Sequence, residues 1–579
     1  MSWLFGKIGN ITSSDLSLFK SIHGGAIYLF NNEQIYIAAG GIKETCLSSL
    51  DEKSGGDKNS GWIASGLGIK SSDNSHVLIK QADWDTILSE NNTDFKKLNG
   101  HFIIAKWVGK QVYLYTDQLG LRDIYLTTSN GNTYFSTRMD WLAKLRGDCD
   151  INYEEFGSRW LLCNQLSTDS ILTNITRVAT GGVVVCSPNT LTIKETVWTP
   201  DNIDIVHNPM LPAVLEGLTA FPMKNGCKLN LSLSGGLDSR VLLSILISKG
   251  YTNWCAYTFG DSKSPDVRVV KRFARDLGFE FEYYNDSLPP TDQFIANFRN
   301  YIGQTSVTTP ASIFLNSRYN LLSYKTNVIL ADGGFGEIVR RRYLNRLLIR
   351  GAGAVNRGDI NSILQHLTVH RADVFSYEIN QRMVKGATNQ LRRIWETMPS
   401  VKQYGMGNWL DLFAIRIRLP NFYGPEQTYL DGKVVNYMPY AQPMFLNSVF
   451  TVPVVLRENG VLLRALLNRN CRKLSKYPLA KDDILYPYGS TVLATWIWSQ
   501  IKHLMGLEYS SNTRVLLLEG LSEYIQDMGN STSVRTAGCY DYPAVKNLIS
   551  QYYSGNKKLA GELDWWLTFE MWRQVVYSK

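Results

Sequence analysis

Short apolar segments that alternate with polar positions dominate the first two hundred residues. The alternation is clearest at residues 26–30, 34–39, 101–107, 111–115 and 133–137. A period of two is typical of strands, and Gly40-Gly41 and Asn130-Gly131 are signals for turns between them. The pattern predicts a β-rich first unit with several hairpins. Further strands at residues 182–187 and 190–198 complete it before a boundary near residue 205.

After that boundary the pattern changes to buried strands that alternate with amphipathic helices. Strands are predicted at residues 228–233, 254–259 and 327–331, and helices at residues 240–248 and 266–277. Strands that alternate with helices form a parallel sheet, and ligands bind at the carboxyl ends of its strands. From about residue 355 the pattern is mostly helical. The predicted fold class is therefore α/β, with a β-rich unit over residues 1–204 and a parallel-sheet unit over residues 205–579.

Composition and charge narrow the class of protein. The 579 residues are 44% hydrophobic and 19% charged, so the apolar surface is large enough to offset the entropy of folding. A formal net charge of +9 is too small for a nucleic-acid coat protein and suggests at most an anionic ligand. The first residues do not show a charged leader before a long apolar run, so we expect no secretory signal, and no stretch approaches the roughly 20 apolar residues of a spanning helix. We expect a soluble cytoplasmic protein without a nucleic-acid or membrane partner.

The strongest candidate for chemistry is the segment Ser234-Gly235-Gly236-Leu237-Asp238-Ser239, between a predicted buried strand and a predicted helix. Two glycines let the backbone approach a phosphate, the serines add hydroxyl donors, and the helix start adds unpaired N–H groups. Asp238 would repel a phosphate unless a cation lies between them, so we interpret it as a Mg²⁺ ligand. The segment has no lysine, unlike a Walker loop, and it is not GxGxxG. It predicts a pyrophosphate site.

The Ser-Gly-Gly-x-Asp-Ser loop resembles the pyrophosphate loop of the ATP pyrophosphatases, and the rest of the chain resembles asparagine synthetase and its relatives. The similar segments are residues 98–102, 113–125, 175–182, 259–266 and 563–572. The resemblance implies an amino-terminal amidotransferase-like unit of the Ntn type, with αββα layers, and a carboxyl-terminal synthetase unit of the ATP-pyrophosphatase type. It implies ATP and Mg²⁺, with ATP held by Leu233, Ser234, Gly235, Gly236, Asp238, Ser239, Phe259, Gly333 and Gly334.

The start of the chain departs from this family. Glutamine-using members begin Met-Cys-Gly, and their cysteine attacks the glutamine amide, whereas this chain begins Met1-Ser2-Trp3. A serine there can in principle act as the nucleophile with its own α-amine as base. The family's glutamine-holding segments, Arg-Gly-Pro-Asp and Asn-Gly-Glu-Ile-Tyr, are also absent from residues 30–100. We therefore expect a first unit that has kept its fold and lost glutaminase activity.

A second departure lies between Asp332 and Tyr343, where family members usually read Ser-Gly-Glu-Gly-x-Asp-Glu. With one inserted residue, Asp332 matches the first acid of that pattern and Glu337 matches the acidic pair. The resemblance then implies that Asp332 and Glu337 are catalytic residues. It also implies that both bind the metal ion together with Asp238. Apart from the resemblance, two acidic residues on either side of a glycine turn suit the binding of a phosphate through a metal ion. The alternative interpretation is a tight acidic turn without a ligand.

Basic residues follow this turn. Arg340, Arg341 and Arg342 stand where the family has small residues, and Arg346 and Arg350 lie further along a predicted helix. With Tyr343 they form a candidate binding site for a phosphate, a uronate or a peptide carboxylate. A solvated basic helix face is the alternative.

A late loop around Lys481 completes the candidate site. Residues 477–489 resemble the family's loop whose lysine stabilises the α-phosphate and pyrophosphate as charge develops. Lys481 fits that lysine by its spacing from the helix predicted at residues 461–473, and Lys476 is the second choice. Stabilisation of developing charge is usually among the largest contributions to catalysis.

The resemblance implies an ATP-dependent, AMP-forming amide ligase, in which ammonia or an amine displaces AMP from an adenylated carboxylate. Three carboxylate substrates fit: a sugar uronic acid of surface-polysaccharide synthesis, a peptide closed to a macrolactam as in lasso-peptide cyclases, and a small β-amino acid as in β-lactam synthetases. We favour the first because the Asp332-Gly-Gly-Phe-Gly-Glu337 loop and the arginines look less like those of a peptide cyclase. A catalytically silent nucleotide-binding protein is the alternative from another class, and a homodimer remains open.

Overall fold

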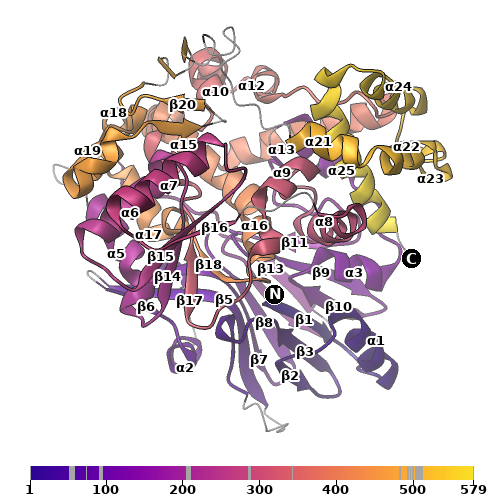
Figure 1. Cartoon of the computed structure of the whole chain (residues 1–579). Helices are drawn as coiled ribbons and strands as arrows, with labels where there is room; N and C mark the ends of the chain where they lie inside the picture. The colour runs from indigo at the N-terminus through magenta and orange to yellow at the C-terminus, as the bar shows by residue number, and fades with distance from the viewer. Residues whose placement is uncertain are drawn as a thin grey trace.

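The computed structural model describes the chain except for residues 1, 51–58, 73–74, 90–94, 163, 189, 204–209, 285–288, 342, 482–483, 492–493, 496, 499–500, 502–512 and 578–579. In Figure 1 two antiparallel sheets from the first part of the chain lie at the bottom, a parallel sheet lies at the left, and the carboxyl-terminal helices lie in yellow at the upper right. Within the described part of the chain, no helix has the length and apolarity needed to cross a membrane.

Two antiparallel sheets form the first unit. The six-stranded sheet has the order β11 (Thr176–Val178), β9 (Ile124–Ser129), β10 (Asn132–Ser136), β1 (Trp3–Ile8), β3 (Ile35–Gly40) and β2 (Tyr28–Asn31). The seven-stranded sheet has the order β13 (Thr190–Lys194), β12 (Val183–Ser187), β8 (Gln111–Thr116), β7 (Leu98–Val108), β5 (Ser60–Ser72) and β4 (Cys46–Ser48), with β6 (Ser75–Leu78) beside β5.

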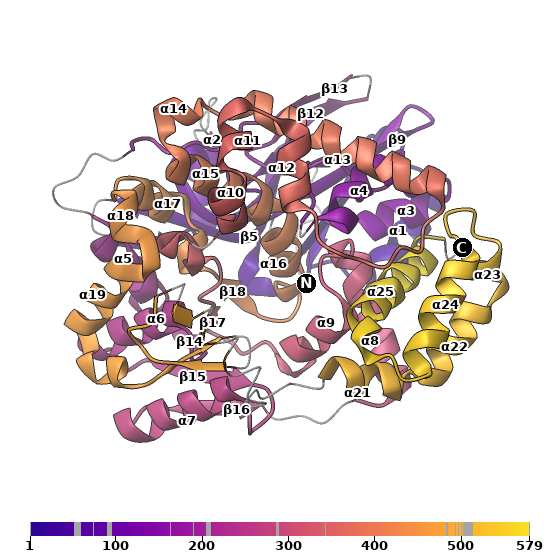
Figure 2. The ribbon, with the colours of Figure 1, turned by 90° about the horizontal axis from the view of Figure 1, so that it is seen from above.

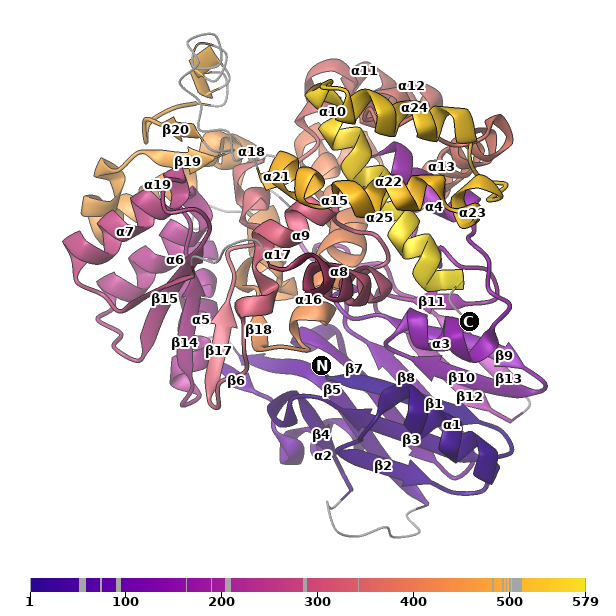
Figure 3. The same ribbon diagram turned by 45° about the vertical axis from the view of Figure 1, so that its right-hand side comes forward.

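The two sheets pack face to face, as Figure 3 shows, and helices cover their outer faces. Both sheets contribute to the apolar core between them, for example through Ile37 and Trp107. The outer face of the six-stranded sheet packs on α1 (Ser13–His23) and α3 (Met139–Arg146), and that of the seven-stranded sheet on α2 (Gln81–Ser89). Successive strand residues point to opposite faces, so each sheet is buried on both sides. The predicted β-rich unit with hairpins is confirmed, with layers in the order helix, sheet, sheet, helix.

A five-stranded parallel sheet forms the centre of the second unit. Its order is β16 (Phe281–Tyr284), β15 (Trp254–Phe259), β14 (Lys228–Ser232), β17 (Val328–Ala331) and β18 (Val435–Tyr437). The three predicted strands are confirmed, whereas the sequence did not indicate β16 or β18.

The predicted helices around this sheet are also confirmed. α6 (Leu237–Ser248) follows β14, and α7 (Pro265–Leu277) follows β15. The Ser264 side chain accepts a hydrogen bond from the N–H of Val267 at the start of α7, and the helix ends at Gly278 in the left-handed conformation. Both ends follow the usual rules for helix caps.

The rest of the second unit is mostly helical, as predicted. Figure 2 shows α13 (Tyr377–Thr397) of the second unit running along α4 (Tyr153–Leu161) of the first. This contact joins the two units. The helices outside the parallel sheet are α5 (Leu211–Lys224), α8 (Thr291–Thr305), α9 (Ala311–Ser317), α10 (Asn345–Arg350), α11 (Ala352–Arg357), α12 (Ile360–Leu367), α13 (Tyr377–Thr397), α14 (Val401–Tyr404), α15 (Met406–Arg418), α16 (Gly424–Leu430), α17 (Pro443–Phe450), α18 (Val454–Arg457), α19 (Val461–Cys471), α21 (Thr513–Gly520), α22 (Ser522–Asn530), α23 (Thr532–Arg535), α24 (Tyr542–Tyr553) and α25 (Ala560–Tyr577).

The contact between the two units is extensive. Leu119 and Leu121 of the first unit belong to the same apolar cluster as Leu419 and Phe445 of the second. The predicted boundary between residues 204 and 205 falls in the segment 204–209, outside the described residues. Apolar burial of this kind fixes the two units against each other.

Candidate functional site

The segment 233–239 connects β14 to α6 at the carboxyl end of the central strand of the parallel sheet. Leu233 is buried, and its N–H donates to the carbonyl of Tyr257 at 2.9 Å. The N–H of Ser234 donates to the Ser239 hydroxyl at 3.1 Å, and the N–H of Gly236 donates to the Ser234 hydroxyl at 3.2 Å. The loop is therefore a compact turn at the start of α6, where helix N–H groups favour an anion.

The neighbouring helix also contacts this loop. The N–H of Gly235 donates to Oδ1 of Asp266, in the first turn of α7, at 2.7 Å. Asp266 follows β15, whose last residue is the half-buried Phe259. The structure thus brings the two segments that carry the family resemblance, 234–239 and 259–266, together at one edge of the sheet.

Arg240 is a residue that the motif did not indicate. Its guanidinium is buried and donates to the carbonyl of Gly235 at 2.7 Å and to the carbonyls of Tyr477 and Pro478 at 3.0 and 2.8 Å. Burial lowers the pKa of Arg240 to about 9. The only sequence signal was a charged residue at the start of an otherwise apolar run, Val241 to Leu243. Arg240 joins the predicted pyrophosphate loop to the late loop, although 237 residues separate it from Tyr477.

The backbone of the late loop lies beside the glycines of the pyrophosphate loop. β19 (Leu479–Lys481) pairs with β20 (Ile484–Tyr486), and the N–H of Ala480 donates to the carbonyl of Gly235 at 3.0 Å. A Cβ added to Gly235 would lie 2.7 Å from Cβ of Ala480, so glycine is needed there. Lys481 follows directly, and its side chain lies outside the described residues. The second choice, Lys476, is exposed.

The loop after β17 packs on the pyrophosphate loop through its glycines. A Cβ on Gly333 would lie 3.1 Å from the backbone nitrogen of Ser239, and a Cβ on Gly336 would lie 2.6 Å from Cβ of Asp238. Gly334, the third glycine of the loop, donates its N–H to Oδ1 of Asp332 at 2.6 Å. The close approach explains the glycine-rich sequence in steric terms, and the two predicted ATP-binding loops are in contact.

Two of the predicted acids already have close partners. Oδ2 of Asp238 accepts a charged hydrogen bond from Arg340 at 2.5 Å. Burial and the charge of Glu426 raise the pKa of Asp332, and the hydrogen bond from Gly334 opposes them. Glu337 is half-buried in the turn Gly336–Arg340. Among the described residues, no three His, Cys, Asp or Glu side chains group closely enough to hold a metal ion by themselves.

The prediction of one basic helix after this turn is wrong. The turn Gly336–Arg340 is followed by Arg341, whose backbone is left-handed with φ of 52°. Leu344 is left-handed as well, with φ of 56°. α10 begins only at Asn345. Because the chain changes direction twice between Arg340 and Asn345, adjacent arginines do not share a face.

The arginines consequently have different partners. Arg340 contacts Asp238 in the candidate site, whereas Arg341 is buried and donates to Oδ1 of Asp411 on α15 at 2.5 Å. Arg342 lies outside the described residues. Arg346 donates to the carbonyl of Thr368, and Arg350 is exposed. Arg341 therefore belongs to the interior of the fold, and the structure corrects its prediction as a residue that faces the substrate.

Tyr343 and Glu426 complete the polar surroundings. Tyr343 is buried, stacks on Phe335 and has its hydroxyl 3.0 Å from that of Tyr423.

Sequence reasoning missed Glu426, which is half-buried on α16. Its carboxylate accepts hydrogen bonds from the hydroxyls of Tyr301, Thr309 and Tyr319 at 3.0, 2.7 and 2.9 Å. Two carboxylates, Asp332 and Glu426, therefore influence each other near the carboxyl end of β17.

Ser2 lies in a separate, buried environment between the two units. Its side chain is fully buried, and its hydroxyl contacts that of Thr45. Its carbonyl accepts from Arg122 at 2.7 Å, and its N–H donates to the carbonyl of Asp431 at 3.2 Å. Arg122 also pairs with the carboxylate of Asp431. Every polar group of Ser2 thus has a partner inside the protein.

Comparison with known proteins finds solved structures that are distantly similar to this chain. No family model and no curated protein matches the chain. One similar solved structure is glutamine phosphoribosylpyrophosphate amidotransferase from B. subtilis complexed with ADP and GMP, at 8% identity and a TM-score of 0.22, covering 68% of this chain and 93% of that chain. Another is the allosteric regulatory enzyme of purine biosynthesis, at 9% identity and a TM-score of 0.22, covering 67% and 91%.

Proposed function

We propose that the chain is an ATP-dependent, AMP-forming amide ligase similar to asparagine synthetase. The observation that carries the proposal is the meeting of three predicted segments at the carboxyl end of β14. The backbone of Gly235 binds Ala480, next to Lys481, and the Asp238–Ser239 turn packs on Gly333 and Gly336. Parallel α/β sheets bind ligands at this edge.

The residues present suit a nucleotide and Mg²⁺. Ser234, Ser239 and the start of α6 supply hydroxyl and N–H donors for phosphate. Asp238, with Asp332 and Glu337, would hold Mg²⁺, which would neutralise phosphate charge. Arg340, which donates to Asp238, adds a positive charge to the same site.

A carboxylate substrate fits the charge of this site. Arg340 offers a planar, permanently charged donor for a carboxylate. Glu426, which accepts hydrogen bonds from three hydroxyls, would accept a proton from an attacking amine or ammonia in this proposal. We favour a sugar uronic acid of surface-polysaccharide synthesis, with a macrolactam-forming peptide or a small β-amino acid as alternatives. A cytoplasmic location, absence of a nucleic-acid partner and a homodimer remain predictions.

The direct test of the proposal is Mg²⁺-dependent ATP–pyrophosphate exchange with candidate carboxylates. Uronic acids, β-amino acids and peptide carboxylates are supplied in turn, and we expect exchange with one class only. Exchange that needs both Mg²⁺ and the carboxylate would identify adenylation. ATP binding without exchange for every class would instead favour the catalytically silent nucleotide-binding protein.

The nitrogen donor gives a separate prediction. Because Ser2 is fully buried and its polar groups are all bound, we expect no glutamine hydrolysis, and ammonia should support amide formation. Ser2→Ala should leave the ammonia-dependent rate within about twofold, since the partners of Ser2 among the described residues are Thr45, Arg122 and Asp431, and none of them belongs to the proposed ATP site. Glutamate release from glutamine is the measurement. Release by the unmodified chain that Ser2→Ala abolishes would show that the first unit is an active glutaminase.

A further inference from the structure

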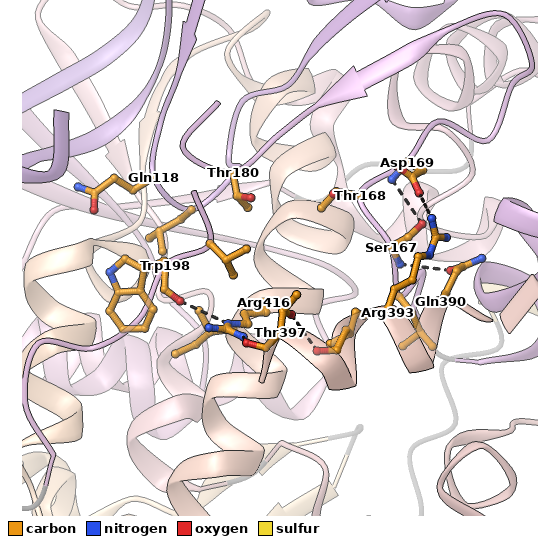
Figure 4. Close-up of a pocket in the computed structure, with 15 residues that line it drawn as sticks. Gln118, Ser167, Thr168, Asp169, Thr180, Trp198, Gln390, Arg393, Thr397 and Arg416 are labelled. Atoms are coloured by element: carbon orange, nitrogen blue, oxygen red, sulfur yellow. Dashed lines mark hydrogen bonds and ion pairs between the residues drawn. The ribbon is translucent and has the colours of Figure 1, made fainter. Parts of the chain in front are cut away.

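A cavity of about 180 Å³ lies between the two units, away from the pyrophosphate loop. Figure 4 shows Gln118 and Thr180 of the first unit on one side of it and Arg393 and Thr397, on α13, with Arg416, on α15, on the other. A molecule bound there would contact both units at once. The proposed ligase chemistry does not use this cavity.

The body of the cavity is apolar. Its apolar lining is Leu119, Leu166, Val197, Trp198, Ile394 and Ile415. A cavity of about 150 Å³ with an apolar lining accepts benzene, so the volume here suits one ring or a short branched chain.

One charge in the cavity has no acidic partner. The guanidinium of Arg416 is half-buried and donates to the carbonyls of Thr397 and Trp198, at 2.8 and 3.4 Å. No Asp or Glu of the described residues forms an ion pair with it. Arg393, in the same wall, is bound by Glu155 and Asp169 at 2.7 Å each. A cation partly removed from water favours an anionic partner, so the cavity combines an apolar body with one positive end.

We propose that this cavity binds a small carboxylic acid with an aromatic or branched alkyl body, whose carboxylate pairs with Arg416. The acid lies between Trp198 and α15, and the hydroxyl of Thr180 lines the same space. Because the ligand contacts both units, it stabilises their association and raises the unfolding temperature of the chain. The site is independent of the proposed ATP site, which lies at the carboxyl end of β14.

The first experiment compares two probes by calorimetry on the full chain. We expect saturable one-to-one binding of phenylacetate with a Kd of about a millimolar or tighter, which is reasonable for so small a ligand. Phenylacetamide has the same shape without the charge and should bind about tenfold or more weakly. No saturation by phenylacetate, or equal affinity for the two probes, would overturn the proposal.

Substitutions in the lining of the cavity test whether phenylacetate binds there. Arg416→Gln should weaken phenylacetate about tenfold or more, whereas Arg393→Gln, whose charge is already neutralised, should change the Kd by about twofold at most. Val197→Trp fills the cavity from a position that is 40% exposed, and it tests the site even if Arg416→Gln does not fold. Arg340→Gln should leave the Kd unchanged, which separates this cavity from the proposed carboxylate site. Equal losses for Arg416→Gln and Arg393→Gln, or unaltered binding by Val197→Trp, would contradict the assignment.

Discussion

Replacement of Lys481 by methionine is expected to lower the rate of ATP–pyrophosphate exchange about 10²- to 10³-fold. The N–H of Ala480, one residue before, binds the carbonyl of Gly235 in the pyrophosphate loop, and Arg240 fixes Tyr477 and Pro478 to the same loop. This backbone geometry places residue 481 one position after a residue that is bonded to the predicted pyrophosphate loop. Methionine keeps the length of the side chain and removes its charge, so the loss would measure electrostatic stabilisation. The measurement is the initial exchange rate at saturating ATP and Mg²⁺.

Lys476 provides the matched control. It lies in the same segment and is exposed, with no hydrogen bond to the pyrophosphate loop among the contacts of the described residues. Lys476→Met should therefore retain the exchange rate within about twofold. If Lys481→Met keeps its activity while Lys476→Met loses it, the assignment passes to the second choice. If both keep it, the late loop does not act in adenylation.

The local parts of the candidate site could be predicted from sequence because they depend on local rules. The alternation of polar residues and leucines at 228–233, followed by Ser234-Gly235-Gly236, defines a strand and a turn, and the structure has both. The start and end of α7 follow from Ser264 and Gly278. β17 has only four residues but was predicted because all four, Val328 to Ala331, are apolar. β16 has the same length but contains a glutamate and is only half-buried, and β18 has three residues with an asparagine at the centre. Such short mixed segments carry little periodic signal.

The partners of the charged side chains could not be predicted in the same way. Arg340 and Arg341 are adjacent in sequence, yet one contacts Asp238 and the other Asp411, because the backbone at Arg341 is left-handed. The hydroxyl groups that bind Glu426 lie 107 to 125 residues away in the sequence. Such contacts depend on the tertiary fold, and no local periodicity encodes them.

The second large effect concerns the buried charges behind the candidate site. Asp411→Ala is expected to lower the free energy of unfolding by about 3–5 kcal/mol. Asp411 accepts hydrogen bonds from Arg341 and Arg457 at 2.5 and 2.6 Å, and the three side chains are almost completely buried. Removing the carboxylate would take from two buried guanidinium groups the negative charge that they share, which is costly in a medium of low polarity. Urea denaturation followed by tryptophan fluorescence measures the change.

An exposed ion pair supplies the comparison. Glu280→Ala removes the partner of Lys228 at 2.7 Å, and because both side chains reach solvent the loss of unfolding free energy should be about 0–1 kcal/mol.

Arg341→Ala tests whether Arg341 is a structural residue or a substrate-binding residue. If Arg341 is structural, the variant loses stability like Asp411→Ala, and its KM values for ATP and carboxylate change in parallel. If it were a substrate residue, stability would persist and the KM for carboxylate alone would rise. Since Asp411 already binds its guanidinium, we expect the first result.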